Sequence, residues 1–261
     1  MPGFESAAEA YDRYAAVYDE TNAENNYEMW LGEVLLPELE KHGLRKGWAL
    51  DVGCGTGRAF EPLLGRGWKV FGCDASAAML AEAEAKFGSQ VGLRTLDARE
   101  LPALAAEAGA PAAGFDLVLL LNDIINYLTE DGDLERAFAG VKRNLDPDHG
   151  LVVFDTNTLS LFRGSFSTGV VHTGEGTEWR GMTEAGEPGT VFEASLEGPG
   201  MEPHVHRQRH WTLGEVSEAL AVCGLRELAT LGQREAPDRV VLTDSPDEEQ
   251  DHKVIHIAAA A

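Results

Sequence analysis

The sequence of 261 residues has few cysteines, no long hydrophobic run and no basic leader. Its three cysteines, Cys54, Cys73 and Cys223, are far apart and form no CxxC pair, which argues against a zinc site and a disulfide framework. No apolar stretch approaches the ~18 residues of a membrane-spanning helix. The N-terminal residues lack a basic start followed by an apolar core, so we expect no secretory signal and a cytoplasmic protein.

Positive charge is also scarce. Lys and Arg together number 21 against 44 Asp and Glu, which gives a formal net charge of −23. Such a surface repels the phosphates of nucleic acids and anionic membranes, and no cluster of Lys and Arg offsets it. We therefore expect neither nucleic acid nor membrane as a partner, and we interpret the acidity as a feature of solubility or salt adaptation.

Helical and strand patterns alternate from Ser6 to about Asp155, which predicts βαβ units and a parallel sheet. The predicted strands cover 48–52, 69–74, 91–97, 115–122 and 151–157, and the predicted helices cover 6–19, 26–42, the segment after the glycines to about 64, 76–87, 100–108 and 132–145. The first helix would carry Tyr11, Tyr14 and Tyr18 on one face, and Ser76 would cap the helix that ends near Phe87.

The pattern changes after this region. Residues 158–211 are rich in Gly, Thr, Glu and Pro, with short alternating runs, and we predict an antiparallel insertion there. Thr212 and Glu215 fit a capping box, so a helix should begin there and end before Gly224. We expect the last two strands at 226–233 and 253–258, separated by an acidic turn over 237–251.

The most specific motif is LDVGCGTG, residues 50–57, where a buried strand leads into three alternating glycines. Glycines at Gly53, Gly55 and Gly57 let the backbone turn tightly and let a ligand approach the main chain. A dinucleotide fingerprint would need a glycine at Arg58, and the Gly-Lys-Ser/Thr of a P-loop is absent. The spacing therefore suits a ligand without a pyrophosphate.

Asp74 ends the next predicted strand, 23 positions after Asp51. A carboxylate at this place can accept hydrogen bonds from both hydroxyls of a ribose. A glycine-rich loop alone is as often an ordinary strand–helix turn, but the loop combined with Asp74 favours a nucleoside site.

Five segments in order resemble the motifs of class I S-adenosylmethionine-dependent methyltransferases. They are LDVGCGTG (50–57), GCDASAAML (72–80), LDARELP (96–102), FDLVLLLND (115–123) and LDPDHGLVVFD (145–155). The resemblance implies an α/β fold with a Rossmann-like, doubly wound, seven-stranded and mostly parallel sheet. It also implies S-adenosylmethionine as cofactor and methyl transfer to a small-molecule acceptor.

The same resemblance implies roles for individual residues. Asp51, Gly53, Gly55 and Gly57 would surround the amino-acid end of the cofactor, Asp74 the ribose, Ala75, Met79, Asp97 and Ala98 the adenine, and Asn122 the sulfonium. For Met79 and Ala98, a place in the hydrophobic core is an equal alternative.

A narrower resemblance rests on YDRYAAVYDETNAENNYEMW, LNDIINYL, FDTNTL and HRQRHWTLGEV. These segments are similar to a bacterial subgroup of small-molecule methyltransferases that includes N-methyltransferases of amino sugars. The likeness implies an N-terminal aromatic helix folded over the cofactor, with Tyr18, Tyr27 and Trp30 against it. The alternative is that these aromatic side chains only attach two helices to the domain.

We accordingly expect three parts in the chain. Residues 1–44 would form an N-terminal helical lid, residues 45–157 and 212–261 the cofactor-binding domain, and residues 158–211 an inserted β cap at the acceptor region.

Methyl transfer is an in-line displacement on a cationic sulfonium, so the protein mainly aligns the reactants and excludes water, which can contribute ~7–11 kcal/mol. The candidates for holding the acceptor are Asp123, Asn126 and Tyr127, because they follow a strand at the edge where open α/β sheets bind ligands. A capped turn with a packed ring explains the same residues equally well.

On a strand, His204, His206, Gln208 and His210 would share one face. The three histidines suit a metal in spacing, but no carboxylate or cysteine accompanies them, so we predict no metal. The face would line the acceptor pocket or contact solvent. His210 is our candidate general base, because an imidazole titrates near neutral pH.

Three other functions stay open. A nucleotide-dependent oxidoreductase can share the fold, although the glycine spacing and the N-terminal helix favour a methyltransferase. A non-catalytic S-adenosylmethionine-binding protein would keep the same glycines and Asp74. A nucleic-acid or protein methyltransferase is disfavoured by the net charge and by the lack of an Asn-Pro-Pro-Tyr-type motif. The oligomeric state is open, a homodimer included.

Overall fold

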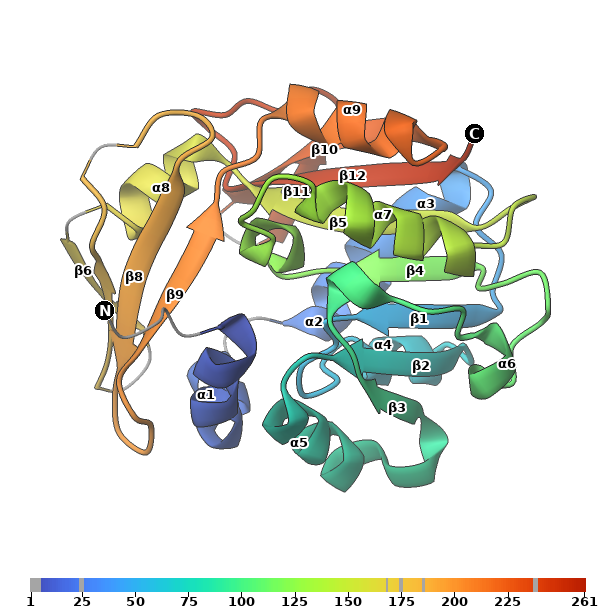
Figure 1. Ribbon diagram of the computed structural model, residues 1–261, viewed down its shortest axis with the longest axis horizontal. Coiled ribbons are helices and arrows are strands. Elements are labelled where there is room, and N and C mark those ends of the chain that lie inside the picture. The colour runs from blue at the N-terminus through green and yellow to red at the C-terminus, as the bar shows by residue number, and fades with distance from the viewer. Residues whose placement is uncertain (1–5, 24–25, 168, 174–175, 185, 237–238) are drawn as a thin grey trace.

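The structure is a computed structural model that describes residues 6–23, 26–167, 169–173, 176–184, 186–236 and 239–261. These residues form two sheets, an eight-stranded one with the order β11-β10-β12-β5-β4-β1-β2-β3 and a four-stranded one with the order β6-β7-β8-β9. Figure 1 shows the smaller sheet beside one end of the larger.

The larger sheet is mixed. Its strands are β1 (Trp48–Val52), β2 (Lys69–Asp74), β3 (Gly92–Thr95), β4 (Leu117–Leu120), β5 (Leu151–Asn157), β10 (Leu225–Ala236), β11 (Arg239–Thr243) and β12 (Lys253–Ala260). Pairing is parallel from β1 to β5 and antiparallel among β5, β12, β10 and β11. The predicted Rossmann-like α/β class, with its mostly parallel sheet, is confirmed.

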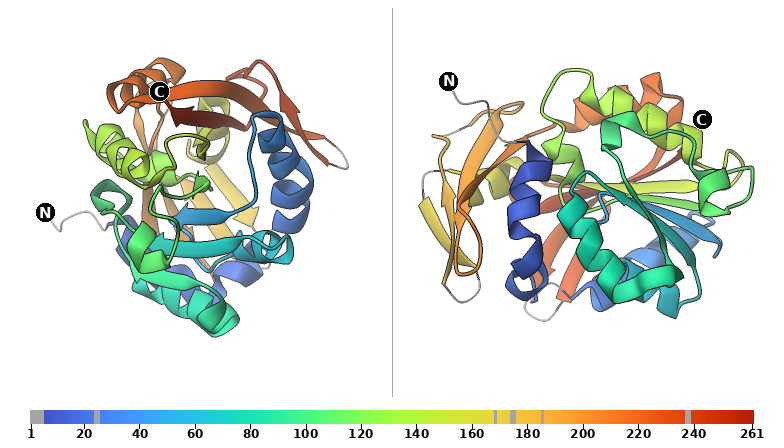
Figure 2. Two further views of the ribbon diagram at one scale, coloured as in Figure 1. Left: turned by 90° about the vertical axis from the view of Figure 1, so that its right-hand side faces the viewer. Right: turned by 60° about the horizontal axis from the view of Figure 1, so that its bottom comes forward.

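Helices cover both faces of this sheet (Figure 2). They are α3 (Leu36–Lys41), α4 (Phe60–Gly65) and α5 (Ala77–Phe87) on one face, with α7 (Asp133–Asn144) and α9 (Leu213–Val222) on the other. Successive strand residues point to opposite faces, so Leu117 and Leu119 of β4 pack on the first layer and Val118 and Leu120 on the second. Burial on both faces explains the continuous hydrophobic runs of the parallel strands.

The expected count of seven strands was wrong by one. The run RVVLT, which we assigned to a turn over 237–251, forms the edge strand β11 and pairs with residues Gly232–Ala236 of β10. The run is short and is followed by acidic residues typical of a turn. We therefore predicted a turn over the whole segment, although its β-branched residues favour a strand.

The four strands of the smaller sheet are all antiparallel. They are β6 (Gly169–Thr173), β7 (Thr177–Gly181), β8 (Val191–Glu197) and β9 (His204–Arg209). A helix that we did not predict, α8 (Leu159–Ser165), precedes them and begins at Thr158, whose Oγ1 accepts from the Leu161 N–H at 3.2 Å. Phe162 of α8 stacks on Phe192 of β8, which gives this sheet a small core of its own.

The N-terminal helix α1 (Ala7–Thr21) begins at a capping box of Ser6 and Glu9. It lies between the smaller sheet and α5, as Figures 1 and 2 both show, and it packs on α5 and β9. The second predicted helix is continuous and is made of α2 (Tyr27–Met29), a π-helical segment η1 (Trp30–Leu35) and α3.

The remaining turns are short. They are η2 (Gly88–Gln90), η3 (Ala98–Glu100), α6 (Ala105–Ala108) and η4 (Ile124–Tyr127). The predicted helix over 100–108 is therefore two pieces, and Pro102, which has no N–H to donate, lies between them. Among the described helices, none is both long and apolar enough to cross a membrane.

Candidate active site

The loop after β1 depends on glycine at each of the three alternating positions. Gly53, Gly55 and Gly57 have φ angles of +73°, +54° and +80°, a region that other residues rarely adopt. A Cβ atom on Gly53 would lie 2.1 Å from Cδ1 of Ile124. A Cβ on Gly55 would meet no described heavy atom within 4 Å, because this residue borders a cavity.

Asp74, at the end of β2, holds this loop. One carboxylate oxygen accepts from the Gly55 N–H and the other from the Ser76 N–H, both at 2.8 Å. Burial raises the pKa of Asp74, and these hydrogen bonds act against that rise. Ser76 also caps α5 as predicted, since its Oγ accepts from the Met79 N–H at 3.1 Å.

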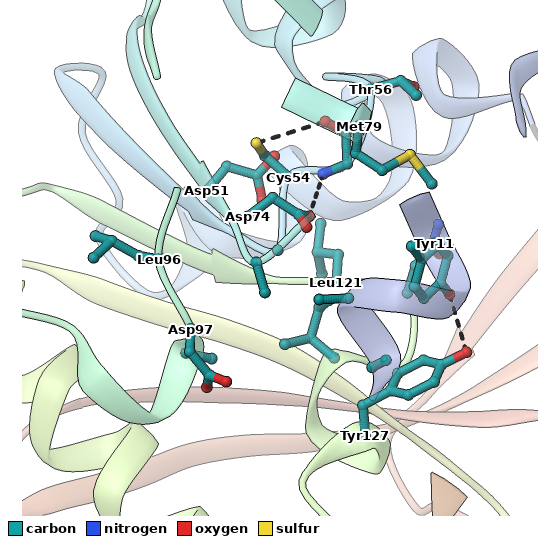
Figure 3. A pocket seen from close by; sticks show the side chains of 18 of the residues that line it. Tyr11, Asp51, Cys54, Thr56, Asp74, Met79, Leu96, Asp97, Leu121 and Tyr127 are labelled. Atoms are coloured by element: carbon teal, nitrogen blue, oxygen red, sulfur yellow. Dashed lines mark hydrogen bonds between the residues drawn. The ribbon is translucent and has the colours of Figure 1, made fainter. Parts of the chain in front are cut away.

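The cavity lies at the carboxyl edge of β1, β2 and β4. Figure 3 shows Asp51 and Asp74 across it from Tyr11 and Tyr127. Of the residues predicted from the sequence, it brings together Tyr18, Tyr27, Asp51, Gly53, Gly55, Asp74, Ala75, Met79, Asp97, Ala98, Asn122 and Tyr127. Met79 is compatible with both alternatives, a place in the core and a place beside the adenine, because its side chain is buried and also lines the cavity.

Two residues predicted to bind the cofactor lie outside this cavity. Gly57 faces the domain interior, where an added Cβ would lie 2.6 Å from Cδ2 of Phe60, so its role is to make the turn. Trp30 donates its indole N–H to Oε1 of Gln233 at 2.9 Å and packs on the hydrophobic core. This matches the alternative in which an aromatic side chain attaches a helix to the domain.

Two residues predicted to act in catalysis line neither this cavity nor the second one described below. Asn126 is buried, donates to the Arg209 carbonyl at 2.8 Å and accepts from the Asn157 N–H at 3.0 Å. His210 is also buried, with Nε2 3.3 Å from a carboxylate oxygen of Glu248. Asn126 connects β9 to β5 of the larger sheet, and His210 connects the segment after β9 to the loop before β12, which accounts for their positions.

Three acidic side chains, Asp51, Asp74 and Asp97, line the first cavity together with Arg58 and Arg99. Burial, and then the charge of Asp74, raise the pKa of Asp51 to about 7. At Asp97 burial also acts to raise the pKa, but hydrogen bonds and charge from Arg99 outweigh it, so this pKa is lowered. A bound cation would stabilise the ionised form of Asp51 and lower its pKa again.

A second cavity opens between α1, α8 and the smaller sheet. Tyr11, Tyr18, Asn122 and Tyr127 line both cavities. The second cavity is further lined by Tyr14, Asp123, Leu161, Phe166, Trp179, Leu196, His206, Gln208 and Lys253.

The predicted polar face of β9 is buried. His204, His206, Gln208 and His210 are each at most 3% exposed, so the alternative of a solvated strand was wrong. His206 and Gln208 line the second cavity. In the described part of the chain, no three His, Cys, Asp or Glu side chains gather as metal ligands would.

Sequence reasoning missed several residues of both cavities. Tyr11 was recognised only as part of an aromatic helix face, and Lys253 only as the start of a strand. Lys253 lies between Asp123 and Asp155, with Nζ 3.4 Å from Asp155 Oδ1, although Asp123 is 130 positions away in the sequence. No local pattern indicates such a contact.

Comparison with known proteins agrees with this arrangement. A protein-family description, methyltransferase domain, matches residues 49–148. The curated protein YqeM of Bacillus subtilis, named as a methyltransferase, is 28% identical over 228 residues, which cover 83% of this chain and 86% of YqeM.

Solved structures share the fold. An S-adenosylmethionine-dependent methyltransferase from Clostridium acetobutylicum has a TM-score of 0.75 at 20% identity, covering 96% of this chain and 99% of its own. CalS10 from Micromonospora echinaspora, described as an amino pentose methyltransferase with bound S-adenosylmethionine, has a TM-score of 0.62 at 18% identity, covering 94% and 97%.

A Rossmann-like sheet with a glycine loop of this kind is typical of class I S-adenosylmethionine-dependent methyltransferases. The methyltransferase domain matched over residues 49–148 and the shared fold support an enzyme of this class with S-adenosylmethionine as its cofactor.

Proposed function

We propose that the protein transfers the methyl group of S-adenosylmethionine to a nitrogen or oxygen nucleophile of a small molecule that enters the second cavity. The observation that carries this proposal is the wall shared by the two cavities, formed by Tyr11, Tyr18, Asn122 and Tyr127. A cofactor in the first cavity and an acceptor in the second would meet at these side chains.

The first cavity fits the cofactor. Open space beside Gly55 leaves room for a ligand against the main chain, and Asp51 offers a buried carboxyl group to the ammonium end. Asp74 would bind the ribose through the lone pairs that its two backbone hydrogen bonds leave free. Ala75, Met79, Asp97 and Ala98 would surround the adenine.

When bound, the cofactor supplies a methyl group on a positively charged sulfur. The nucleophile's lone pair forms the new bond to the methyl carbon, the electron pair of the broken carbon–sulfur bond stays on sulfur, and any surplus proton passes to water. The chain's own residues contribute by alignment and exclusion of water, worth ~7–11 kcal/mol in favourable cases. Tyr127 remains our candidate for holding the acceptor, while Asn126 and His210 would act only through the packing of β9.

We further propose the three-part organisation expected from the sequence, in which residues 1–44 form a lid over the cofactor. Hydrogen bonds between side chains support it: Asp12 accepts from Ser76, and Asp19 accepts from Thr56, both at 2.6 Å, so α1 is tied directly to the cofactor-binding region. Residues 158–211 would form the cap that selects the acceptor, and residues 45–157 and 212–261 would bind the cofactor.

The second cavity is rich in aromatic side chains, which suits a small organic acceptor better than a polyanion. The net charge of −23 also disfavours nucleic acid. CalS10 is described as acting on an amino pentose, and its fold supports an amine-bearing acceptor as the first class to test.

The test is a transfer assay with S-adenosylmethionine that carries a labelled methyl group. The purified protein is incubated separately with a cell extract passed through a small-pore filter, with total RNA and with total protein from the same cells. We expect label in the filtered small molecules, and little label with the Asp74→Ala variant. Label only in RNA or protein would contradict the proposal.

A further inference from the structure

Tyr11, Tyr127 and His206 form a chain of hydrogen bonds that joins three distant parts of the fold. The Tyr11 hydroxyl of α1 donates to the Tyr127 oxygen of η4 at 3.0 Å, and the Tyr127 oxygen lies 2.7 Å from Nδ1 of His206 on β9. Ring packing supports the same arrangement, with edge-to-face centroid distances of 5.5 Å between the two tyrosines and 5.4 Å between Tyr11 and His206. These hydrogen bonds therefore connect α1, which borders the first cavity, with the smaller sheet.

A phenol has one hydroxyl hydrogen, and that of Tyr11 is directed to Tyr127. Tyr127 accepts there, so its own hydrogen is available to Nδ1 of His206 when that ring nitrogen carries no proton. The corresponding tautomer of His206 is neutral and has its proton on Nε2, and the first test below measures it directly. Burial, and then the neighbouring His204, lower the pKa of His206 to about 3, in agreement with a neutral ring.

Tyr11 and His206, at the two ends of this hydrogen-bonded series, differ in the groups available to a ligand. The hydroxyl hydrogen of Tyr11 is already bonded to Tyr127, so the Tyr11 oxygen can only accept further hydrogen bonds. His206 ends the chain with an Nε2 that is buried and has no hydrogen-bond partner among the residues that the structure describes. Tyr11 and Tyr127 line both cavities, whereas His206 lines only the second.

From this geometry we propose that His206 is a positioning residue for methyl transfer, which acts through Tyr127 to fix the Tyr11 oxygen as a hydrogen-bond acceptor where the two cavities meet. This inference rests on the proposed function. It also narrows the acceptor class, because a lone-pair oxygen at that place binds a nucleophile that carries a hydrogen. Primary and secondary amines and hydroxyl groups fit, and tertiary amines do not.

The first test needs no acceptor. In protein labelled with ¹⁵N at histidine, the shifts of His206, assigned by comparison with His206→Phe, should report Nδ1 without a proton and Nε2 with one. In Tyr127→Phe the Nδ1 shift should move, because its hydrogen-bond donor is gone. A proton on Nδ1 in the wild-type protein, or no change in Tyr127→Phe, would overturn the proposal.

The second test measures the rate at which a labelled methyl group passes from S-adenosylmethionine to the filtered small molecules, with S-adenosylhomocysteine binding measured in parallel by calorimetry. His206→Phe keeps a ring of similar size and should lower the transfer rate roughly 3- to 10-fold, as loss of one hydrogen bond does. Binding of S-adenosylhomocysteine should change little, because His206 does not line the first cavity. His206→Asn, which can place an amide oxygen near the position of Nδ1, should recover part of the lost transfer rate. His256→Phe is the matched control, since His256 is equally buried but lines neither cavity. Equal effects of His206→Phe and His256→Phe on the transfer rate, or no recovery in His206→Asn, would overturn the proposal.

A double-mutant cycle distinguishes failure of this proposal from failure of the methyltransferase function on which it rests. If His206 acts through Tyr127, the loss of transfer rate in Tyr127→Phe/His206→Phe should be clearly smaller than the combined losses of the two single variants. Additive losses would overturn the role of His206 while leaving the methyltransferase function intact. Failure of the wild-type protein to bind S-adenosylhomocysteine would instead overturn the function itself.

Discussion

The carboxylate of Asp155, at the buried end of β5, accepts the backbone N–H of Asn122 at 2.7 Å. Its other oxygen accepts the N–H of Asp123 at 2.8 Å. Asn122 and Asp123 have φ angles of +60° and +70°, and they are the described non-glycine residues with positive φ. One buried acid therefore holds a strained turn at the place where the two cavities meet, and the Lys253 ammonium group balances its charge.

Removal of this acid should destabilise the protein strongly. Asp155→Ala leaves two buried N–H groups without a partner and weakens the balance of charge at Lys253, so we expect a loss of ~3–5 kcal/mol in the free energy of unfolding. Urea denaturation measures this loss. The exposed Asp148→Ala is the control and should change stability by less than ~0.5 kcal/mol. A loss at Asp155 as small as that of the control would show that the turn does not depend on the carboxylate.

A pair of glycine substitutions tests the space beside the loop. Gly55 and Gly132 have φ angles of +54° and +84°, and a Cβ on either would meet no described atom within 4 Å. Both alanine variants should therefore lose stability by a similar ~1–2 kcal/mol. Only Gly55 lines the first cavity, so only Gly55→Ala should weaken S-adenosylhomocysteine binding in calorimetry. Equal binding by the two variants would mean that the ligand lies elsewhere.

The pKa of Asp51 predicts a dependence of binding on pH. In the free protein burial and Asp74 raise this pKa to about 7, so the carboxyl group is protonated below that value. Its ionised form attracts the cofactor's ammonium group, so affinity should rise as pH increases through about 7, and binding below it should release a proton. Calorimetry in buffers of different ionisation enthalpy measures that release. Asp51→Asn should remove both effects, and their persistence would assign them to another group.

Asp51 has the opposite effect on the stability of the free protein. Its pKa in the folded state lies above the ordinary value of 3.8, so ionisation is disfavoured by folding. Its contribution should be most favourable at low pH, where the group is protonated in both states, and should be lost as pH rises from about 4 to 7. The Asp51→Asn variant should lack this decline in urea denaturation. A wild-type decline that persists in the variant would contradict the assignment.

The sequence predicted those features that depend on neighbouring residues. The bounds of β1, β2 and β5 follow from hydrophobic runs, and Ser76 was recognised as the cap of α5. Gly53, Gly55 and Asp74 meet because two adjacent parallel strands end at the same edge of the sheet. The motif spacing contained that information.

Contacts between distant segments were not predictable in this way. Tyr11 and Tyr127 are 116 positions apart, and Tyr127 and His206 are 79 apart, so only the packing of α1 and β9 brings them together. Asn126 and His210 have the residue types of a catalytic site, but long-range packing uses both for structure. Residue type and strand phase specify which face a side chain is on, and they do not specify which element covers that face.

The central claim is that the glycine loop and Asp74 bind the nucleoside of S-adenosylmethionine, and calorimetric titration with S-adenosylhomocysteine tests it most directly. The wild-type protein should bind one equivalent per chain. Asp74→Ala should bind ~1–3 kcal/mol more weakly, because its hydrogen bonds to the ribose are lost. Equal affinity of the two proteins, with the variant shown to be folded, would contradict the account.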